Sequence, residues 1–322
     1  MSKILVTGGA GFIGCNIVRR LIAEGHDVRV LDNFSTGQRE NLKGVDVELI
    51  EGDLTSYHMV QRAIKGVDYV LHQGALPSVP RSVKDPIATT NVNVMGTLNV
   101  LTAAHEEGVK RVVYASSSSV YGDTLELPKR ETMLPQPKSP YAASKLAGEY
   151  LCRVFYETYG LEVVILRYFN VFGPFQNPHS QYAAVIPKFI TAALKGEPVT
   201  IFGDGRQSRD FTFVDNVVEA NLAALQAPKS ALGKPINIAC GQSYTLLDLV
   251  ATLEELLDTT IKRVFKEPRP GDVQHSLADI SLAKELLGYE PKVDFREGLR
   301  RTVAWYRDRV EAGGTQLDRA ST

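Results

Sequence analysis

The chain has 322 residues, of which 44% are hydrophobic and 23% charged, with a formal net charge of −1. This composition is typical of a folded globular protein, and a nearly neutral chain without basic or acidic blocks argues against a nucleic-acid partner or a membrane surface. No long apolar stretch interrupts the sequence, so we expect a cytoplasmic protein. Cys15, Cys152 and Cys240 form no CxxC pair, and the six histidines have no metal-ligand spacing, so we expect neither a disulfide framework nor a metal site.

The first half of the chain alternates short apolar runs with amphipathic segments. Six runs rich in Val, Ile and Leu are predicted strands: 4–7, 27–31, 47–51, 69–72, 111–115 and 163–168. Helical patterns such as 12–24 and 97–107 lie between them and are long enough for right-handed crossovers. The pattern therefore predicts an α/β domain over residues 1–170, with a doubly wound parallel sheet covered by helices on both faces.

The pattern changes after Asn170, where Pro and Gly become frequent. Predicted helices and short strands then alternate: 184–194, 199–202, 236–239 and 245–257. This predicts a smaller, discontinuous α+β region over residues 171–211 and 241–310, with segments near 212–240 that return to the main sheet. Residues 311–322 are polar, and we expect a frayed tail.

Residues 4–14 read ILVTGGAGFIG, a glycine-rich turn between the first strand and the first helix. Gly9, Gly11 and Gly14 fit GxGxxG, while Gly8, Gly11 and Gly14 give a GxxGxxG spacing. Such glycines allow a tight turn and the close approach of a pyrophosphate to a helix N-terminus. The turn predicts a dinucleotide site, and the alternative is a strand-to-helix turn without a ligand.

Acidic residues follow the second and third predicted strands. Asp32 lies where a carboxylate would accept hydrogen bonds from the adenosine ribose and repel a 2′-phosphate. This favours NAD over NADP, although Arg39 lies nearby. Asp53 is interpreted either as a helix N-cap or as a partner of the adenine amino group.

Residues 139–149 read SPYAASKLAGE and predict the start of a helix. Ser139 suits the N-cap and Pro140 the first turn, so Tyr141 and Lys145 lie one turn apart on one face. A phenol has a pKa of about 10, so it acts as an acid or base at neutral pH only beside a positive charge, which Lys145 would supply. The alternative is an ordinary surface pair with this spacing.

The motifs TGGAGFIG, DNFSTG, GDL, YASSSSVYG, SPYAASK and RYFNVFGP together resemble the extended short-chain dehydrogenase/reductase family. The resemblance covers the chain to about Tyr306 and is closest to the nucleotide-sugar 4-epimerases. It implies a Rossmann domain that holds NAD tightly and a discontinuous C-terminal region that binds a UDP-sugar.

The resemblance also implies a homodimer. The helices at 97–107 and 141–159 carry apolar residues on more than one face: Leu98, Leu101, Leu151, Val154, Phe155 and Tyr159. One face of each helix would pack on the sheet and the other on a partner. The alternative is a monomer in which these helices are simply well buried.

The resemblance assigns catalytic roles to three residues. Tyr141 would take the proton of the sugar 4-hydroxyl, and Lys145 would hold the nicotinamide ribose and lower the pKa of Tyr141. Ser117 would hydrogen-bond the reacting hydroxyl. NAD would take the hydride from carbon 4, and its return to the opposite face of a rotated 4-keto sugar would invert that carbon.

The remaining contacts are likewise implied by the resemblance. NAD would also contact Gly8, Gly11, Phe12, Ile13, Gly14, Asp32, Asn33, Ser35, Thr36, Gly37, Asp53, Leu54, Gln73, Ala75, Asn93, Ala115, Tyr168 and Val171. The UDP-sugar would also contact Ser78, Ser118, Ser119, Asn170, Phe202, Arg209, Arg269, Asp272 and Ser276. Without the resemblance, Asn93 is an ordinary helix residue, Phe202 a core aromatic, and the arginines solvated charges.

Two features of the sequence distinguish between the possible reactions and substrates of similar enzymes. Similar dehydratases and decarboxylases carry an acidic residue within the segment 117–119, where this chain has only serines, and this favours epimerisation. Ser276 is small enough to admit a 2-acetamido group, and LHQGALPSVPRS (71–82) resembles members that prefer N-acetylated sugars. We therefore predict interconversion of UDP-N-acetylglucosamine and UDP-N-acetylgalactosamine, with UDP-glucose and UDP-galactose also accepted.

Two alternatives stay open. One is a UDP-glucuronate 4-epimerase or another NAD-dependent enzyme acting on a UDP-sugar, because several basic residues could meet a carboxylate. The other is an idle NAD-binding regulator, which the presence of Ser117, Tyr141 and Lys145 together disfavours.

Overall fold

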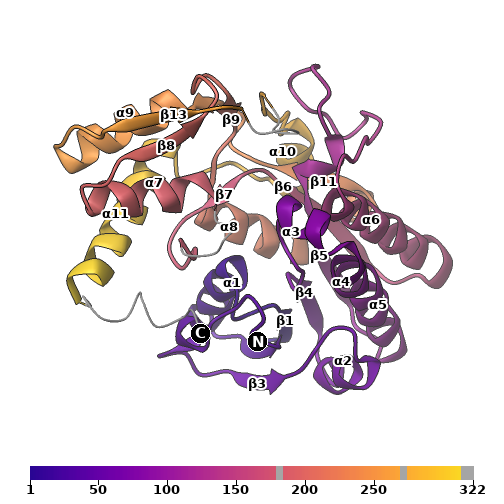
Figure 1. Cartoon of the computed structure of the whole chain (residues 1–322). Helices are drawn as coiled ribbons and strands as arrows, with labels where there is room; N and C mark the ends of the chain where they lie inside the picture. Colours follow the sequence, from indigo (N-terminus) through magenta and orange to yellow (C-terminus); the bar gives the residue numbers. More distant parts are fainter. Residues whose placement is uncertain (179–183, 269–273, 313–322) are drawn as a thin grey trace.

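Seven parallel strands form the central sheet of the computed structural model, which describes residues 1–178, 184–268 and 274–312 (Figure 1). The strands are β1 (Lys3–Thr7), β2 (Asp27–Asp32), β3 (Glu48–Glu51), β4 (Tyr69–His72), β5 (Arg111–Ser117), β6 (Val163–Tyr168) and β11 (Pro235–Ile238). Their order in the sheet is β11-β6-β5-β4-β1-β2-β3. The predicted doubly wound α/β fold is therefore confirmed.

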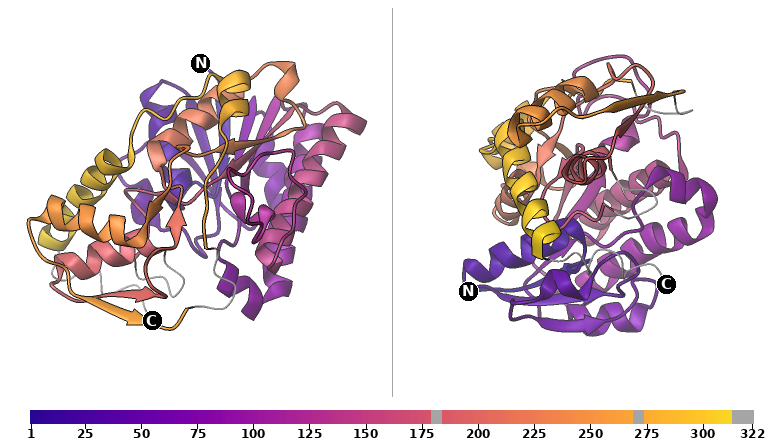
Figure 2. Two further views of the ribbon diagram at one scale, coloured as in Figure 1. Left: turned by 90° about the horizontal axis from the view of Figure 1, so that it is seen from above. Right: turned by 60° about the vertical axis from the view of Figure 1, so that its left-hand side comes forward.

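Alternating side chains give the sheet a hydrophobic core on each face. In β1, Ile4 and Val6 belong to one core and Leu5 to the other. The first core packs against α1 (Phe12–Ala23), α8 (Val214–Leu225) and α10 (Ser281–Leu287). The second packs against α2 (Tyr57–Ile64), α5 (Gly96–Glu106) and α6 (Pro140–Tyr159). Figure 2 shows these helices on the two sides of the sheet.

The order of the strands reverses between β1 and β4. The chain leaves β1 toward β2 on one side of the sheet, whereas β4, β5 and β6 follow one another on the other side. In such sheets the crevice at the carboxyl ends of the strands, beside the reversal, binds ligands. The glycine turn follows β1, and the serine run lies at the end of β5, so both open onto this edge.

Shorter elements build a second region around its own core. Its strands form three pairs, β7 (Val171–Phe172) with β10 (Thr212–Phe213), β8 (Val199–Phe202) with β13 (Arg263–Lys266), and β9 (Ser208–Arg209) with β12 (Tyr244–Thr245). Its main helices are α7 (Val185–Leu194), α9 (Leu246–Leu257) and α11 (Phe295–Ala312). Aromatic rings fill the core, and those of Tyr244 and Phe295 stack at 4.2 Å between centroids. Helix α11 continues two residues into the predicted tail, and residues 313–322 lie outside the described residues.

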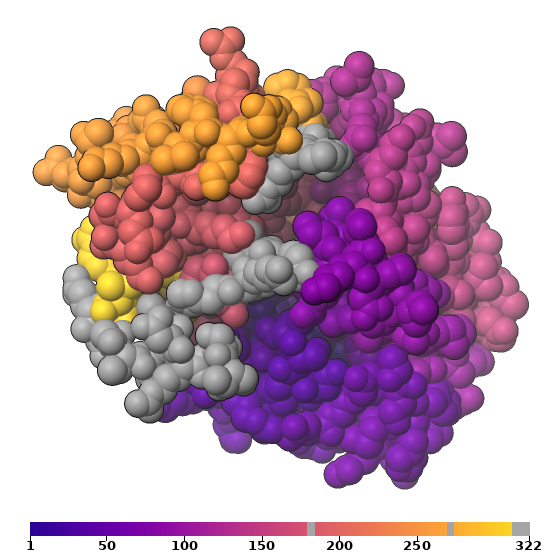
Figure 3. All heavy atoms as spheres, viewed as in Figure 1, coloured from indigo at the N-terminus to yellow at the C-terminus, as the bar shows by residue number. Residues whose placement is uncertain are grey.

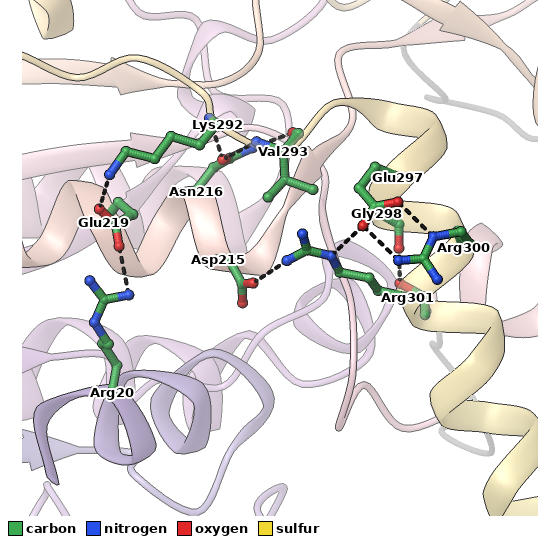
Figure 4. Close-up of polar contacts among 11 residues, drawn as sticks. Arg20, Asp215, Asn216, Glu219, Lys292, Val293, Glu297, Gly298, Arg300 and Arg301 are labelled. Carbon is green, nitrogen blue, oxygen red and sulfur yellow. Dashed lines mark hydrogen bonds and ion pairs between the residues drawn. The ribbon is translucent and has the colours of Figure 1, made fainter. Parts of the chain in front are cut away.

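Helix α8 links this second region to the Rossmann layer. Glu219 accepts from Arg20 of α1 at 2.7 Å and from Lys292 at 2.9 Å (Figure 4). Asn216 accepts from the main-chain nitrogens of Lys292 and Val293. These bonds fix the segment before α11 beside α1. Figure 3 shows the face on which the two regions meet, with a hollow between them.

The predicted boundaries agree with the structure to within one residue, except at β5. The prediction ended that strand at Ala115, but it continues to Ser117, with Ser116 opposite Arg167 and Ser117 opposite Tyr168 of β6. The hydroxyl run therefore starts inside the sheet. Two short helices before α5 were not predicted, α3 (Val79–Lys84) and α4 (Pro86–Thr90).

Candidate active site

The glycine turn after β1 leaves no room for side chains where the chain folds back on itself. A Cβ on Gly14 would lie 2.1 Å from the carbonyl oxygen of Gly8, and Gly8 itself has φ +67°. A Cβ on Gly9 would lie 2.7 Å from Val30 of β2. Gly11 differs, because an added Cβ would meet only the Gly8 oxygen, at 3.1 Å. Both glycine spacings thus contribute to the turn, and Gly11 marks the side from which a phosphate can approach.

Asp32, the last residue of β2, binds the glycine turn. Its Oδ2 accepts from Ala10 N at 2.9 Å and its Oδ1 from Phe34 N at 2.8 Å. Burial raises the pKa of Asp32, and these main-chain bonds oppose the shift. Each carboxylate oxygen can accept a second bond, so two ribose hydroxyls can still be bound. Arg39 pairs with Glu51 and lies over the Phe34 ring at 4.0 Å, so its charge is already engaged.

The loop that follows β2 packs on the same turn. Phe12 and Ile13 begin α1, and a Cβ on Gly37 would lie 2.8 Å from the main chain of Ala10. Asn33, Ser35 and Thr36 are exposed. Their position beside Asp32 is consistent with the predicted cofactor contacts.

Asp53 is not the N-cap of a helix, so that alternative is wrong. Ser56 occupies the N-cap position of α2. Asp53 instead accepts from Thr55 and, at 2.6 Å, from Nδ2 of Asn33. The contact joins the loops after β2 and β3, and Leu54 beside it is buried. The predicted bond from Asp53 to adenine stays a prediction.

Hydrogen bonds of Gln73 and Asn93 fix the chain after β4. Gln73 accepts from the Tyr168 hydroxyl at 3.2 Å and donates to Asn221 of α8 at 3.0 Å. Asn93 bonds the main chain of Leu76 and donates to Ser144 of α6 at 3.0 Å. Asn93 lies in a single π-helical turn, a feature frequent at functional sites. Asn93 therefore fixes the loop that contains Ala75. Asn221, which bonds Gln73 and Tyr168, was not predicted from the sequence.

Tyr141, Lys145 and Ser117 lie where α6 packs on the carboxyl end of β5. Ser139 caps α6 by accepting from Ala142 N at 3.1 Å, which places Tyr141 in the first turn. Lys145 is buried and its Nζ donates to the carbonyl of Ala115 at 2.9 Å. Burial raises the pKa of Tyr141, and a hydrogen bond with Ser117 opposes the rise.

The serine run orders its own hydroxyls. Oγ of Ser117 accepts from the main-chain nitrogen of Ser119 at 3.2 Å and from its hydroxyl at 2.9 Å. Because its acceptor positions are used, the Ser117 proton is available for Tyr141 or for a bound hydroxyl. Ser118 and Ser119 begin a short 3-10 turn (Ser118–Tyr121) and are partly exposed. Ser116 is buried and points instead to Glu149.

Several of the predicted substrate residues lie in the second region or next to it in the chain. Asn170 donates to the hydroxyl of Ser276 at 3.4 Å and to the carbonyl of Asp210 at 3.1 Å. Arg209 bonds the carbonyls of Ser208 and Gln274. Phe202 ends β8 and Ser78 caps α3 with φ +100°. Val171, a predicted contact of NAD, begins β7. Arg269 and Asp272 lie outside the described residues.

Asp210 organises these loops and was not predicted. It is fully buried and accepts from Cys240 N and Gly241 N at 3.0 Å and from Ala278 N at 3.2 Å. Burial raises its pKa to about 6, and the main-chain bonds oppose the rise. The carboxylate joins three chain segments beside Asn170.

The described residues fit NAD. The turn at Gly8, Gly11 and Gly14 excludes side chains, Asp32 keeps acceptor capacity, and a buried lysine points toward the end of β5. Within the described part of the chain, no group of three or more His, Cys, Asp or Glu could hold a metal ion. No helix among the described residues is both long and apolar enough to cross a membrane.

A family model described as the NAD dependent epimerase/dehydratase family matches residues 4–239. The chain belongs to this family. It is 37% identical over 319 residues to the UDP-glucose 4-epimerase of Mycolicibacterium smegmatis, covering 96% of this chain and all of the relative. The resemblance seen in the sequence and the prediction of NAD as cofactor are confirmed.

Two solved structures of similar proteins bind UDP-sugars. The UDP-glucose 4-epimerase of Thermotoga maritima, with UDP-glucose, is 39% identical, with a TM-score of 0.92 over 96% of this chain and 99% of the other. The UDP-N-acetylglucosamine 4-epimerase of Methanobrevibacter ruminantium M1, in complex with UDP-N-acetylmuramic acid, is 41% identical, with a TM-score of 0.91 over the same shares. Both structures therefore share the fold of this chain over nearly their whole length.

Proposed function

We propose that this chain is an NAD-dependent UDP-sugar 4-epimerase that interconverts UDP-N-acetylglucosamine and UDP-N-acetylgalactosamine and also accepts UDP-glucose and UDP-galactose. The observation that carries the reaction is the meeting of Ser117, Tyr141 and Lys145 at the end of β5. No carboxylate interrupts the segment 117–119, so inversion at carbon 4 needs no further acid there. The two similar proteins of known structure are a UDP-glucose 4-epimerase and a UDP-N-acetylglucosamine 4-epimerase, which supports this range of substrates.

Tyr141 is the proposed acid and base. Its phenolate accepts the proton of the 4-hydroxyl and returns it after the sugar has turned. The Lys145 ammonium stabilises the phenolate, and the Ser117 hydroxyl orients the reacting oxygen. When bound, NAD supplies a reversible two-electron oxidant for carbon 4. The glycine turn, Asp32 and Lys145 would hold it.

The second region, residues 171–211 and 241–310, is proposed to bind the UDP-sugar. Asn170 and Arg209 lie beside Ser276, and an amide and a guanidinium both suit a diphosphate. Ser276 is small, which supports space for a 2-acetamido group beside Asn170. Ser78, Ser118 and Ser119 are proposed sugar contacts, and Phe202 a contact of uracil.

The substrate range is tested by incubating the purified protein with three sugars separately, with and without added NAD: UDP-N-acetylglucosamine, UDP-glucose and UDP-glucuronate. The anomeric protons are followed by NMR. We expect the 4-epimer from the first two sugars. Turnover of UDP-glucuronate alone would replace the proposed substrate by the alternative, and no product from any of them would refute the activity.

We also propose that two copies form a dimer through α6. Leu101 and Phe155 are buried in the core beside the sheet, so they belong to the face that packs on the sheet. Large apolar side chains that are exposed on α6 and beside it support a partner surface: Ile87, Met95, Tyr150, Val154 and Tyr159. Helix α6 contacts both α3 and α4, so these residues lie on neighbouring elements.

The dimer is tested by light scattering with Val154→Asp. A charge at the centre of an apolar interface should convert a dimer to a monomer, whereas Arg153→Asp, on an exposed neighbour, should leave the mass unchanged. A monomeric parent protein would contradict the proposal.

A further inference from the structure

A buried ion pair lies under the carboxyl end of β5, one helical turn from Lys145. Glu149 of α6 is 5% exposed and Arg167 of β6 is 2% exposed. Arg167 donates to both carboxylate oxygens, from Nε at 2.8 Å and from Nη2 at 2.6 Å. Ser116 donates to the same carboxylate at 2.5 Å, and the guanidinium lies 4.8 Å from the centre of the Tyr121 ring.

Stability alone does not account for this pair. Removing two charges from water costs about as much as their attraction returns, and apolar replacements of buried pairs are often neutral or stabilising. A second pair, Arg111 and Glu162, lies at the other ends of β5 and β6, where Glu162 keeps 34% of its side chain exposed. A fully buried pair at the reactive end therefore points to a second role.

Helix α6 and strand β5 meet along three successive helical turns. Tyr141, Lys145 and Glu149 are spaced by four residues, so they share one face of α6. Three consecutive residues of β5 meet them: the Ala115 carbonyl accepts from Lys145, Ser116 donates to Glu149, and Ser117 opposes the rise in the pKa of Tyr141. The Arg167 fork ties the Glu149 contact to β6.

We propose that Glu149, held by Arg167 and Ser116, is a positioning residue for the epimerase reaction, which fixes α6 on β5 and stabilises the Lys145 ammonium. This inference rests on the roles proposed above for Tyr141 and Lys145. Glu149 does not reach the sugar, because its oxygens are bonded within the protein and its side chain is buried.

The charges around Lys145 give the sign of the effect. The titratable groups that face it are Glu149 and Cys152 of α6, Tyr114 of β5 and His72 of β4, while Arg167 of β6 pairs with Glu149. Tyr141 lies one helical turn before Lys145 on α6. Burial lowers the pKa of Lys145 to about 8, and Cys152 and Glu149 act in the opposite direction. The ammonium that stabilises the phenolate is present below this pKa and is lost as the pH rises through it. Removing the Glu149 charge should move that loss to lower pH.

The test uses the NAD-loaded enzyme and three variants. Glu149→Gln removes one charge, and the double variant Glu149→Gln/Arg167→Met removes both and leaves no unpaired buried arginine. Glu162→Gln, at the other end of the strands, is the matched control. Thermal melting verifies that each variant folds, and kcat and KM are measured across the neutral and alkaline range.

We expect kcat of the double variant to fall roughly 10- to 100-fold with KM unchanged, because the reacting groups are misplaced while the sugar contacts remain. The alkaline limb of its kcat profile should move down by about one pH unit. Glu162→Gln should leave kcat and the alkaline limb in place.

A second measurement does not depend on turnover. Ultraviolet titration of tyrosinate, compared with the same protein carrying Tyr141→Phe, isolates the pKa of Tyr141. That pKa should be higher in the double variant, because the Lys145 charge supports the phenolate less.

A folded double variant that matches the parent in kcat, pH profile and Tyr141 titration would overturn the inference and leave the pair a structural one. Failure of the proposed function would look different. An active Tyr141→Phe enzyme would refute the role of Tyr141 itself, whatever the ion-pair variants do.

Discussion

An arginine–glutamate pair lies at each end of strands β5 and β6, and the two pairs differ in their surroundings. At the amino end, Arg111 donates to Glu162 at 2.7 Å and to the carbonyls of Ala224 and Leu225, and Glu162 remains in contact with solvent. At the carboxyl end, Arg167 and Glu149 are both almost fully buried.

The comparison separates a structural pair from one that belongs to a site. The amino-end pair fastens α8 to the start of β5 and touches no predicted functional residue. The carboxyl-end pair adjoins the strand end that holds Lys145 and Ser117. The same two residue types therefore have different roles at the two edges of one sheet. Ligands of such sheets bind at the carboxyl edge, where the Arg167–Glu149 pair lies.

Among substitutions at the two edges of the sheet, Tyr141→Phe at the carboxyl edge should lower kcat the most. Loss of the phenol removes the proposed acid and base, so kcat should fall by about 10³-fold. Tyr156→Phe, on the same helix, is the control and should keep the parent rate. The measurement is the initial rate of 4-epimer formation, and a rate close to the parent's would remove Tyr141 from the mechanism.

Glycine substitutions at the two edges come next. Gly14→Ala would place a Cβ 2.1 Å from the Gly8 oxygen, so the turn should open and NAD should no longer copurify. Gly108, before β5 at the amino edge, has φ +67° and no atom near an added Cβ. Gly108→Ala should therefore cost only about 1 kcal/mol and retain NAD. NAD released by heating is measured, and equal NAD content in both variants would contradict the assigned turn.

A smaller effect within the carboxyl edge concerns the choice of sugar. Ser276→Tyr should fill the space beside Asn170, so turnover of UDP-N-acetylglucosamine should fall roughly 10-fold relative to UDP-glucose. Ser276→Ala preserves the space and should preserve the ratio. Competition between the two sugars in one reaction gives this ratio directly. An unchanged ratio in Ser276→Tyr would show that another residue limits the pocket.

The smallest effect should come from the amino-end pair. Glu162→Gln removes a partly hydrated charge, and we expect a loss of unfolding free energy below about 1 kcal/mol with kcat unchanged. Denaturant unfolding and the epimerisation rate measure the two quantities. A large loss of kcat in this folded variant would erase the distinction between the edges.

Local features of the site could be predicted from the sequence. The turn at Gly8–Gly14, the Ser139 cap and the spacing of Tyr141 and Lys145 all depend on residues close together in the chain. Backbone geometry and helical period then fix where the side chains point. The resemblance added Ser117, which lies in the same segment as its own partner Ser119.

The parts that the sequence missed depend on contacts between distant segments. Glu149 pairs with Arg167 across 18 residues, and Gln73 meets Asn221 across 148. Asp210 joins loops that no periodicity connects, and a buried aspartate in a short polar segment looks like a surface residue. The acidic partner of Ser116 could not be identified from spacing, because Glu149 lies 33 residues further along the chain.

The central claim is that carbon 4 of the sugar is oxidised and reduced within one site at the carboxyl edge. UDP-N-acetylglucosamine carrying deuterium at carbon 4 tests it most directly, with the enzyme in ordinary water and the products examined by NMR and mass spectrometry. The account predicts that the deuterium remains on carbon 4 of the epimer. Replacement of that deuterium by solvent hydrogen during epimerisation would contradict it.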